Sequence, residues 1–397
     1  MKEFPLDNVT VIDFTQILAG PFCTMLLADM GANVIKIEKP NGGDDTRRFG
    51  PPFLNGESVA FIGINRNKRS IVLDLKTETG VDVARSMIAK ADIVIQNSRP
   101  GAMDRMGLNY ERVCIDKPGL IYCTISGFGA TGPYSHKAGF DLVAQGMSGL
   151  MSITGLPGSP PIKAGVPVAD FNTGMYSTYA ILSAYIHKLK TGKGQHVDAS
   201  LLDSAIAYTL YESMAYFATG DVATPVGSAH RMIAPYQAFA TSDGYINVAA
   251  ANQSNWVRLC NAIGREDLLK ESRFSSNSER MIHIGELTPI MDRTFSKETT
   301  GYWVTLLEKA GVPCGPIYNM AQVYADPQVR ARNMAVELEH PVAGKIRNIG
   351  VPVKLSETPG EIYRPAPTLG QHTLQILSEF GFSPGEIANY KELGVVQ

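Results

Sequence analysis

Short apolar runs rich in β-branched residues alternate with amphipathic segments over roughly the first third of the chain. The apolar runs predict strands at residues 9–13, 33–38, 69–75, 92–96 and 120–126, and the segments between them predict helices at 21–30 and 80–91. Such alternation is typical of a parallel sheet with helices on both faces. The pattern therefore predicts an α/β fold.

The loops after the predicted strands are the first candidates for a binding site. Open parallel sheets bind their ligands in a crevice beyond the carboxyl ends of the strands. We therefore expect residues 15–20, 97–105 and 127–137 to border one crevice.

The pattern changes after long helices that are predicted at residues 171–217. Residues 235–249 predict a β-hairpin turning at Asp243-Gly244, and amphipathic helices are expected from about 255 to 310. We expect a Rossmann-like large domain of residues 1–217, completed by 329–397, and a smaller α+β domain of residues 225–315.

Composition narrows the class of protein. The 397 residues are 44% hydrophobic, which is enough for a large core. The 36 Lys and Arg stand against 38 Asp and Glu, so no basic field is available for nucleic acid or an anionic membrane surface. The N-terminus has no apolar signal region, and no run is long enough to span a membrane.

Metal, disulfide and nicotinamide chemistry are not predicted. The five cysteines are odd in number and lack a C-x-x-C pair, and the seven histidines fall singly. Gly127-Phe-Gly129-Ala-Thr-Gly132 matches a G-x-G-x-x-G pattern, but Pro133 follows at once and no acidic residue stands about 20 residues later to hold a ribose. We expect no metal site and a cytoplasmic location.

Asp170 is the most informative single residue. It follows an extended apolar run in which Pro167 blocks earlier helix formation, and it stands where a long helix is expected to begin. As an N-cap it would accept backbone N–H groups and face the positive end of the helix dipole, which favours the ionised form by roughly 0.3–1 kcal/mol. A fixed, ionised carboxylate suits covalent acyl chemistry. A purely capping role is the alternative.

Over essentially the whole chain the sequence resembles the class III CoA-transferases, which include carnitine CoA-transferase-like and α-methylacyl-CoA racemase-like enzymes, and an ordered series of segments carries this resemblance. The segments are, in order, Asp13-Phe-Thr-Gln-Ile-Leu-Ala-Gly-Pro21, Gly31-Ala-Asn-Val-Ile-Lys-Ile-Glu38, Asn65-Arg-Asn-Lys-Arg-Ser70, Arg99-Pro-Gly101, Asp104-Arg-Met-Gly107, Gly127-Phe-Gly129, residues 165–174, and Thr191-Gly-Lys-Gly-Gln195. This resemblance implies that Asp170 is the nucleophile and that the protein is an interlocked homodimer.

The resemblance also implies the chemistry. Asp170 would form a mixed anhydride and then an aspartyl-CoA thioester, with acyl-CoA and a small carboxylic acid as substrates and no permanently bound cofactor. The CoA phosphates need several cations near the strand ends. By resemblance, CoA contacts fall at Lys39, Leu73, Lys76, Asn97, Ser98, Arg99, Arg105 and Lys137.

The acid substrates are suggested by residues 42–53, 229–231 and 235–239, which look most like the branch that uses succinyl-CoA and short dicarboxylates such as glutarate or itaconate. Arg47 and Arg231 are the candidates for holding the distal carboxylate, because Arg binds carboxylates through paired hydrogen bonds. Backbone amides at 127–129, or at Gly227 and Ser228, are candidates for an oxyanion site.

Oxalate and formyl-CoA are disfavoured as the natural pair. The oxalate-using relatives have Gln where this chain has Leu18, and their glycine run is longer than residues 226–228.

Two other functions remain open. A racemase of the same family places His where this chain has Phe140, and Phe cannot move a proton; His136 is a poor substitute. A CoA-binding scaffold without catalysis is disfavoured by the intact Asp170.

Overall fold

The computed structural model describes residues 3–397, and contacts within the chain divide it into two units. The first comprises residues up to Met151, Lys163–Asp221 and Pro327–Gln397. The second comprises Ser152–Ile162 and Val222–Asp326. The segment Ser152–Ile162 thus belongs to the second unit, although the division predicted from the sequence placed it in the large domain.

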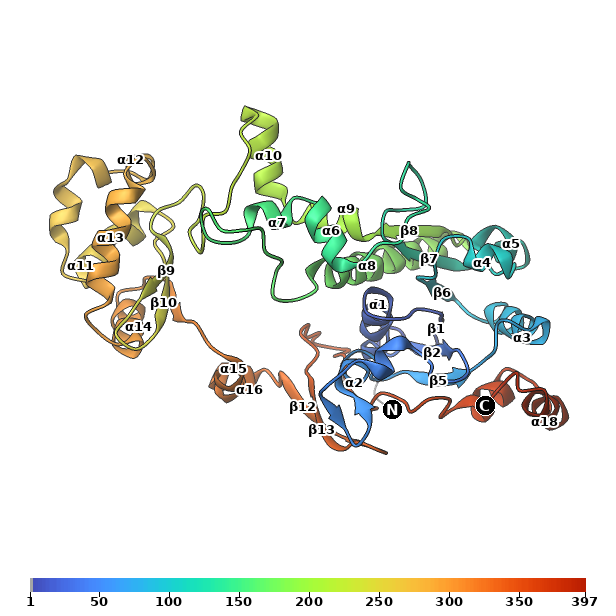
Figure 1. Cartoon of the computed structure of the whole chain (residues 1–397). Helices are drawn as coiled ribbons and strands as arrows, with labels where there is room; N and C mark the ends of the chain where they lie inside the picture. The colour runs from blue at the N-terminus through green and yellow to red at the C-terminus, as the bar shows by residue number, and fades with distance from the viewer. Residues whose placement is uncertain (1–2) are drawn as a thin grey trace. The chain divides into compact units, whose positions relative to one another are not determined.

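A six-stranded parallel sheet forms the centre of the first unit (Figure 1). Its strands are β1 (Thr10–Asp13), β2 (Asn33–Glu38), β5 (Arg69–Val72), β6 (Ile93–Gln96), β7 (Ile121–Ser126) and β8 (His196–Ser200). They run in the order β5-β2-β1-β6-β7-β8, and every neighbouring pair is parallel. The predicted sheet is confirmed, although β5 ends at Val72. The sequence analysis missed β8, because it is a half-exposed edge strand without an apolar run.

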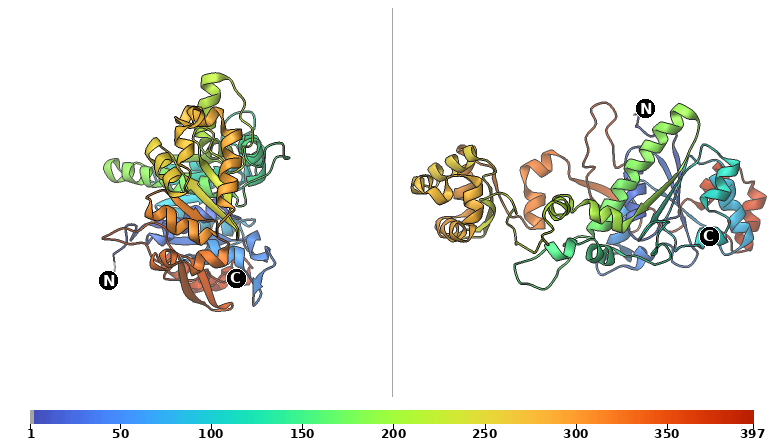
Figure 2. Two further views of the ribbon diagram at one scale, coloured as in Figure 1. Left: turned by 90° about the vertical axis from the view of Figure 1, so that its left-hand side faces the viewer. Right: turned by 90° about the horizontal axis from the view of Figure 1, so that it is seen from above.

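Helices cover both faces of this sheet, as the right-hand view of Figure 2 shows. One face packs against α1 (Ala19–Asp29), α8 (Val168–Thr191) and α9 (Leu201–Ala207). The other packs against α3 (Glu78–Ile88), α4 (Ala102–Arg105), α5 (Tyr110–Asp116), α17 (Thr373–Glu379) and α18 (Pro384–Glu392). Adjacent residues of one strand enter different cores: Val11 packs on the α1 side and Ile12 on the α3 side, as strand alternation requires.

The first unit also contains shorter elements. They are η1 (Asp45–Arg48), the hairpin of β3 (Phe53–Leu54) and β4 (Glu57–Ser58), α2 (Val59–Ile64), α6 (Asp141–Met147), α10 (Leu210–Thr219), α16 (Pro327–Ala331), and the hairpin of β12 (Ala335–His340) and β13 (Gly344–Ile349). The helix α7 (Leu150–Ile153) spans the boundary between the units. The long helical stretch predicted at 171–217 is therefore three helices, with β8 between α8 and α9.

The second unit contains a small antiparallel sheet in the order β11-β10-β9. Its strands are β9 (Tyr236–Ala240), β10 (Tyr245–Ala249) and β11 (Cys314–Pro316), and its helices are α11 (Gln253–Ala262), η2 (Glu266–Lys270), η3 (Ser272–Phe274), α12 (Asn277–Ile282), α13 (Ile284–Phe295), α14 (Thr300–Lys309) and α15 (Met320–Ala325). The predicted hairpin is confirmed: Thr241 N donates to Gly244 O at 2.9 Å. Buried Trp256, Phe274 and Phe295 belong to the core of this unit.

The strand order of the large sheet reverses between β1 and β6, because β2 and β5 lie on one side of β1 while β6, β7 and β8 lie on the other. Doubly wound sheets bind their ligands at such a point. The two loops that leave it are joined there: Gln16 N donates to Asn97 Oδ1 at 2.8 Å, and Asn97 Nδ2 donates to Gln16 O at 2.7 Å.

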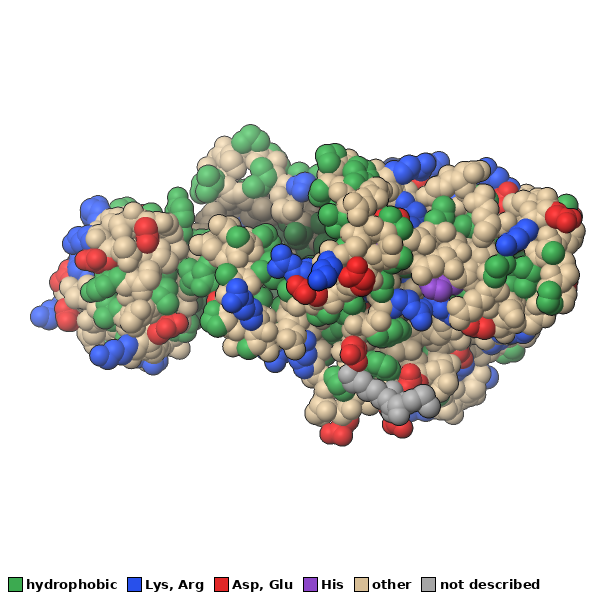
Figure 3. Space-filling view, turned by 90° about the horizontal axis from the view of Figure 1, so that it is seen from below, with side chains coloured by type: hydrophobic (Ala, Val, Ile, Leu, Met, Phe, Trp, Pro, Cys, Tyr) green, Lys and Arg blue, Asp and Glu red, His purple; other side chains and the backbone are tan. Residues whose placement is uncertain are grey.

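The surface carries both signs of charge. Acidic and basic side chains are interspersed on the face shown in Figure 3, in keeping with the net charge of -2. Among residues 3–397 no helix combines the length and the apolar character needed to cross a membrane.

Candidate functional site

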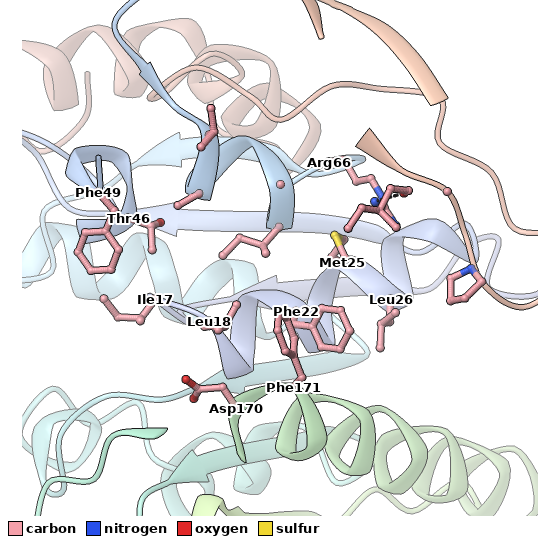
Figure 4. A pocket seen from close by; sticks show the side chains of 17 residues that line it. Ile17, Leu18, Phe22, Met25, Leu26, Thr46, Phe49, Arg66, Asp170 and Phe171 are labelled. Carbon is pink, nitrogen blue, oxygen red and sulfur yellow. Dashed lines mark hydrogen bonds between the residues drawn. The ribbon is translucent and has the colours of Figure 1, made fainter. Parts of the chain in front are cut away.

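Asp170 lines an apolar pocket of about 610 Å³ in the first unit (Figure 4). The pocket is bordered by Ile17 and Leu18 from the loop after β1, by Phe22 from α1, and by Phe171 from α8. Further walls come from η1, α2 and the residues that follow β13. A partly buried carboxylate is thus placed in an apolar pocket, beside the point where the strand order reverses.

Asp170 is held on rigidly packed helices. A Cβ atom on Gly174 would lie 2.7 Å from Ala19 O, so α1 and α8 approach closely only because this residue is glycine. The rings of Phe22 and Phe171 meet edge to face with centroids 4.9 Å apart. The backbone around Asp170 is therefore fixed by the contact between these two helices.

The predicted N-cap role of Asp170 is wrong. Asp170 is the third residue of α8, and Pro167 occupies the cap position without a side-chain hydrogen bond. Instead, the carboxylate of Asp141, at the start of α6, caps α8. Its Oδ1 accepts from Ala169 N at 2.9 Å and from Asp170 N at 3.4 Å. Sequence reasoning missed Asp141, because its partners lie 28 and 29 residues further along the chain.

The electrostatic setting of Asp170 also differs from the expectation. Burial, and secondly the nearby charge of Asp141, raise the pKa of Asp170 from 3.8 to about 7. Burial opposes the stabilisation of the ionised form that the helix terminus was expected to give. A carboxyl group with such a pKa is partly protonated at neutral pH.

The loops predicted to border one crevice do meet. A second cavity, of about 390 Å³, is lined by Ser98, Arg99 and Gly101 from the loop after β6, and by Gly129 and His136 from the loop after β7. The hydrogen bonds between Gln16 and Asn97 join the loop after β1 to the same group.

All five basic residues suggested as CoA contacts are accessible. The side chains of Lys39, Lys76, Arg99, Arg105 and Lys137 are exposed. Lys39 pairs with Asp45 at 2.7 Å, and the ammonium group of Lys137 lies 3.8 Å from the ring centroid of Tyr134.

The other suggested CoA contacts are committed within the chain. Leu73 is 1% exposed and belongs to the core, where its backbone bridges to Val396. The side-chain amide of Asn97 bonds the backbone of Gln16, and Ser98 N donates to Gln96 Oε1 at 2.8 Å.

The two Arg residues suggested for the acid lie in different units. Arg47 makes a bidentate pair with Glu38, with Nε to Oε2 at 2.8 Å and Nη2 to Oε1 at 2.7 Å, and its guanidinium lies 3.6 Å from the ring centroid of Phe61. Arg231, in the second unit, donates to Thr224 O at 2.5 Å.

Two of the backbone amides suggested as oxyanion donors already have acceptors, and the Ser228 side chain has a donor. Gly129 N donates to Ser126 Oγ, and Gly227 N donates to Gly155 O, both at 2.9 Å. Ser228 Oγ accepts from Ala238 N at 3.1 Å.

The glycine pattern and the histidines considered in the sequence can be placed in the structure. The G-x-G-x-x-G pattern at 127–132 opens no helix, since α6 begins only at Asp141. Within residues 3–397 no group of three or more His, Cys, Asp or Glu side chains is arranged to hold a metal ion. His136 lines the second cavity, and Phe140 is 66% exposed.

The chain matches CoA-transferase family III over residues 6–373. It is 43% identical to human succinyl-CoA:glutarate CoA-transferase, over 94% of this chain and 86% of the relative. It is also 43% identical to succinate–glutarate CoA-transferase of Agrobacterium fabrum, over 95% of this chain and 96% of that one.

A solved structure agrees with these sequences. A CAIB/BAIF family protein from Brucella suis superposes with a TM-score of 0.85 at 40% identity, covering 96% of this chain and all of that one. The fold and the site define an α/β protein with a parallel sheet and a carboxylate beside its switch point. This chain belongs to CoA-transferase family III.

Proposed function

We propose that this protein transfers CoA from an acyl-CoA, most suitably succinyl-CoA, to a short dicarboxylic acid. The observation that carries the proposal is the carboxyl group of Asp170 in an apolar pocket at the switch point of the sheet. The names of the human and Agrobacterium fabrum relatives, both glutarate CoA-transferases, support the choice of acids.

The reaction begins with the carboxylate of Asp170 attacking the thioester carbonyl, which releases CoA thiolate and leaves a mixed anhydride. The thiolate then attacks the aspartyl carbonyl of the anhydride, so the donor acid leaves and an aspartyl-CoA thioester remains. The carboxylate of the acceptor acid attacks this thioester, which releases CoA thiolate and forms a second anhydride between Asp170 and the acceptor. The thiolate then attacks the acceptor's carbonyl group in this anhydride, which gives the new acyl-CoA. Asp170 returns as a carboxylate.

The apolar pocket suits these intermediates. Both the anhydride and the aspartyl thioester are lost if water attacks them, so exclusion of water protects every turnover. The same desolvation raises the pKa of Asp170 and makes its ionised form a stronger nucleophile than an ordinary aspartate.

CoA is proposed to bind along the carboxyl edge of the sheet. The exposed Lys39, Lys76, Arg99, Arg105 and Lys137 are the proposed cations for its phosphates, and backbone groups near Leu73, Asn97 and Ser98 are the proposed neutral contacts. CoA is a substrate in this proposal.

Arg231 and Arg47 are the proposed partners of the distal carboxylate, with Gly227 and Ser228 as neighbours of the acid. Arg47 is already paired with Glu38 in a bidentate geometry. To hold a substrate, Arg47 must exchange Glu38 for the acid, and Arg231 must likewise give up its bond to Thr224 O.

A homodimer, interlocked as the family resemblance implies, is part of the proposal. Its support is an apolar surface in the first unit: none of the residues of α10 is buried, and α8 exposes several large apolar side chains. They are Met175, Tyr176, Tyr179, Ile186 and Leu189 on α8, and Leu210, Tyr211, Met214, Tyr216 and Phe217 on α10. Exposed apolar patches of this extent mark interaction surfaces.

The central experiment replaces Asp170 by Ala or Asn. Exchange of CoA between succinyl-CoA and glutarate is expected to vanish, while the circular dichroism spectrum stays unchanged. Mass spectrometry of the wild type with succinyl-CoA should find a hydroxylamine-sensitive adduct on the peptide that carries Asp170. Asp203→Ala is the matched control, because Asp203 is an exposed carboxylate in the first turn of α9. Substantial exchange by Asp170→Ala would end this mechanism.

The choice of acid is tested by a panel of acceptors. Dicarboxylates of about four to six carbons should be good acceptors and their monocarboxylate analogues poor ones. A monocarboxylate has no distal carboxylate, so the Arg that is proposed to bind this group would be left unpaired. Arg231→Ala should raise the KM of the acid more than that of succinyl-CoA. Butyrate matching glutarate would overturn the acid assignment and leave the CoA-transferase proposal standing.

A further inference from the structure

Ile17, in the wall of the Asp170 pocket, has an unusual backbone conformation. Its φ is +71°, in the left-handed region. Among residues 3–397 the other non-glycine residues with positive φ are all Asn, a residue that tolerates this region, whereas a β-branched side chain is a genuine outlier there. Strain of this kind persists only where surrounding contacts impose it.

The residues before Ile17 are held by side chains from three strands or their ends. Asp13 Oδ1 accepts from Thr15 N at 2.8 Å, and Lys36 Nζ donates to Thr15 O at 2.7 Å. Asn97 bonds both backbone groups of Gln16. The backbone of Thr15 and Gln16, immediately before Ile17, is therefore fixed by these hydrogen bonds.

Asp44 completes this set. Its Oδ1 accepts from Ile17 N at 3.2 Å and from Thr46 N at 2.9 Å, while its Oδ2 lies 2.9 Å from Lys36 Nζ. The side chains of Asp44 and Lys36 are completely buried. Such a pair is kept only when both charges are well compensated.

The electrostatics of the pair are consistent with a permanently charged contact. Burial alone would raise the pKa of Asp44, but Lys36 and the backbone N–H groups of Thr46 and Ile17 outweigh burial and hold the pKa at about 2. Burial likewise disfavours charged Lys36, yet Asp44, Asp13 and Glu38 outweigh it and raise the pKa of Lys36.

Ile17 and its neighbour Leu18 line the same pocket as Asp170 (Figure 4). Leu18 is also the residue before α1, the helix that packs on α8. A change of φ at Ile17 would move both side chains and the entry into α1.

We propose that Asp44, oriented by Lys36, is a positioning residue that holds Ile17 in the left-handed conformation and so sets the wall of the pocket beside Asp170. The role rests on the proposed CoA-transferase function. It concerns the turnover of bound substrate rather than affinity for CoA, because the exposed cations proposed for the CoA phosphates do not include these residues.

The first test measures the strain. Ile17→Gly and Ile17→Ala both remove the side chain beyond Cβ, but only glycine is free of the penalty at positive φ. Ile17→Gly should therefore melt roughly 1–2 °C higher than Ile17→Ala, because the strain of one residue is spread over the unfolding entropy of a 397-residue chain. An Ile17→Ala variant that melts at the same temperature or higher would show that Ile17 is not strained, and this result would overturn the proposal whatever the activity is.

The second test removes the acceptor of Ile17 N without leaving a buried charge unpaired. Lys36→Met is combined either with Asp44→Asn, which keeps a side-chain oxygen for Ile17 N, or with Asp44→Leu, which has a similar shape and no acceptor. We expect the kcat of the Leu combination to be at least about tenfold below that of the Asn combination, with the KM for succinyl-CoA within about twofold.

The third arm repeats the Asn and Leu comparison in the Ile17→Gly background. Glycine adopts positive φ without help, so the difference in kcat should shrink to less than about threefold. An undiminished difference, or equal kcat values for the two combinations with Ile17 intact, would refute the positioning role. A wild type that exchanges no CoA would instead refute the proposed function, and the melting comparison would still decide whether Ile17 is strained.

Discussion

Replacing Asp141 by Asn should make the enzyme active at lower pH. Asp141 contributes to Asp170 in two ways: its Oδ1 accepts the amides of Ala169 and Asp170, and its negative charge raises the pKa of Asp170. Asn keeps an oxygen for the amides and removes the charge. The variant therefore separates the electrostatic effect from the helix cap.

The magnitude follows from the two causes of the raised pKa. The pKa of Asp170 rises from 3.8 to about 7, a difference of about 3, and burial is the larger cause. Asp141 is the smaller cause. In Asp141→Asn the pKa of Asp170 should therefore fall below about 7 but stay well above 3.8, because burial remains.

The assay is the pH dependence of kcat/KM for succinyl-CoA, from about pH 5 to 8.5, because kcat/KM reports ionisations of the free enzyme. In the proposed mechanism only ionised Asp170 attacks, so the wild-type kcat/KM should rise with pH to a plateau, with its midpoint at about 7. The midpoint should move to lower pH in Asp141→Asn. Gln145→Met is the matched control, since it removes the bond from Gln145 Nε2 to Asp141 Oδ2 without removing a charge.

A midpoint that stays in place or rises in Asp141→Asn would refute this reasoning. Stability offers an independent check of sign. The pKa of Asp170 is higher in the folded protein than in the unfolded chain, so the folded state binds more protons between about pH 4 and 7. This group therefore stabilises the fold at low pH, and its contribution is lost as pH rises through about 7.

Three further outcomes are expected. Arg66→Met should lower the free energy of unfolding by about 3–5 kcal/mol in urea titrations, because it leaves the buried carboxylate of Asp29 without its partner at 2.7 Å; a loss below 1 kcal/mol would contradict this. A chiral α-methylacyl-CoA in heavy water should neither racemise nor gain deuterium, since Phe140 is no base; rapid deuterium uptake would favour the racemase. Sedimentation at micromolar concentration should find a dimer, and a reversible monomer would contradict the interlocked assembly.

The sequence predicts much of the large sheet because its buried strands are continuous apolar runs. Residues 33–38 predict β2 with its observed bounds. The strand β8 is not predicted, because His196–Ser200 mixes polar and small residues at a half-exposed edge of the sheet. The loops of the crevice could be predicted, since they follow from parallel strands alone. The division between α8 and α9 could not be predicted, because it depends on β8, which lies between them.

The surroundings of the predicted nucleophile were not accessible from local patterns. An acidic residue after Pro at a helix start is normally a cap, and Asp170 fits that description. The real cap, Asp141, comes from another helix, and so does the charge that helps to raise the pKa of Asp170. Likewise nothing next to Ile17 in the sequence predicts positive φ, because the contacts that impose it come from Asp44 and Asn97.

The apolar pocket has two opposing effects on the chemistry proposed for Asp170. In the proposed mechanism an apolar pocket helps to protect an anhydride from water, but it also disfavours the carboxylate that forms the anhydride. If Asp170 were itself the N-cap, hydrogen bonds from the backbone amides would stabilise its ionised carboxylate and make that carboxylate a weaker nucleophile. Moving the cap to Asp141 leaves the carboxylate of Asp170 without that stabilisation while the helix terminus is still satisfied. The pKa of about 7 is then a compromise, in which enough carboxylate is present at neutral pH and little of its nucleophilicity is lost.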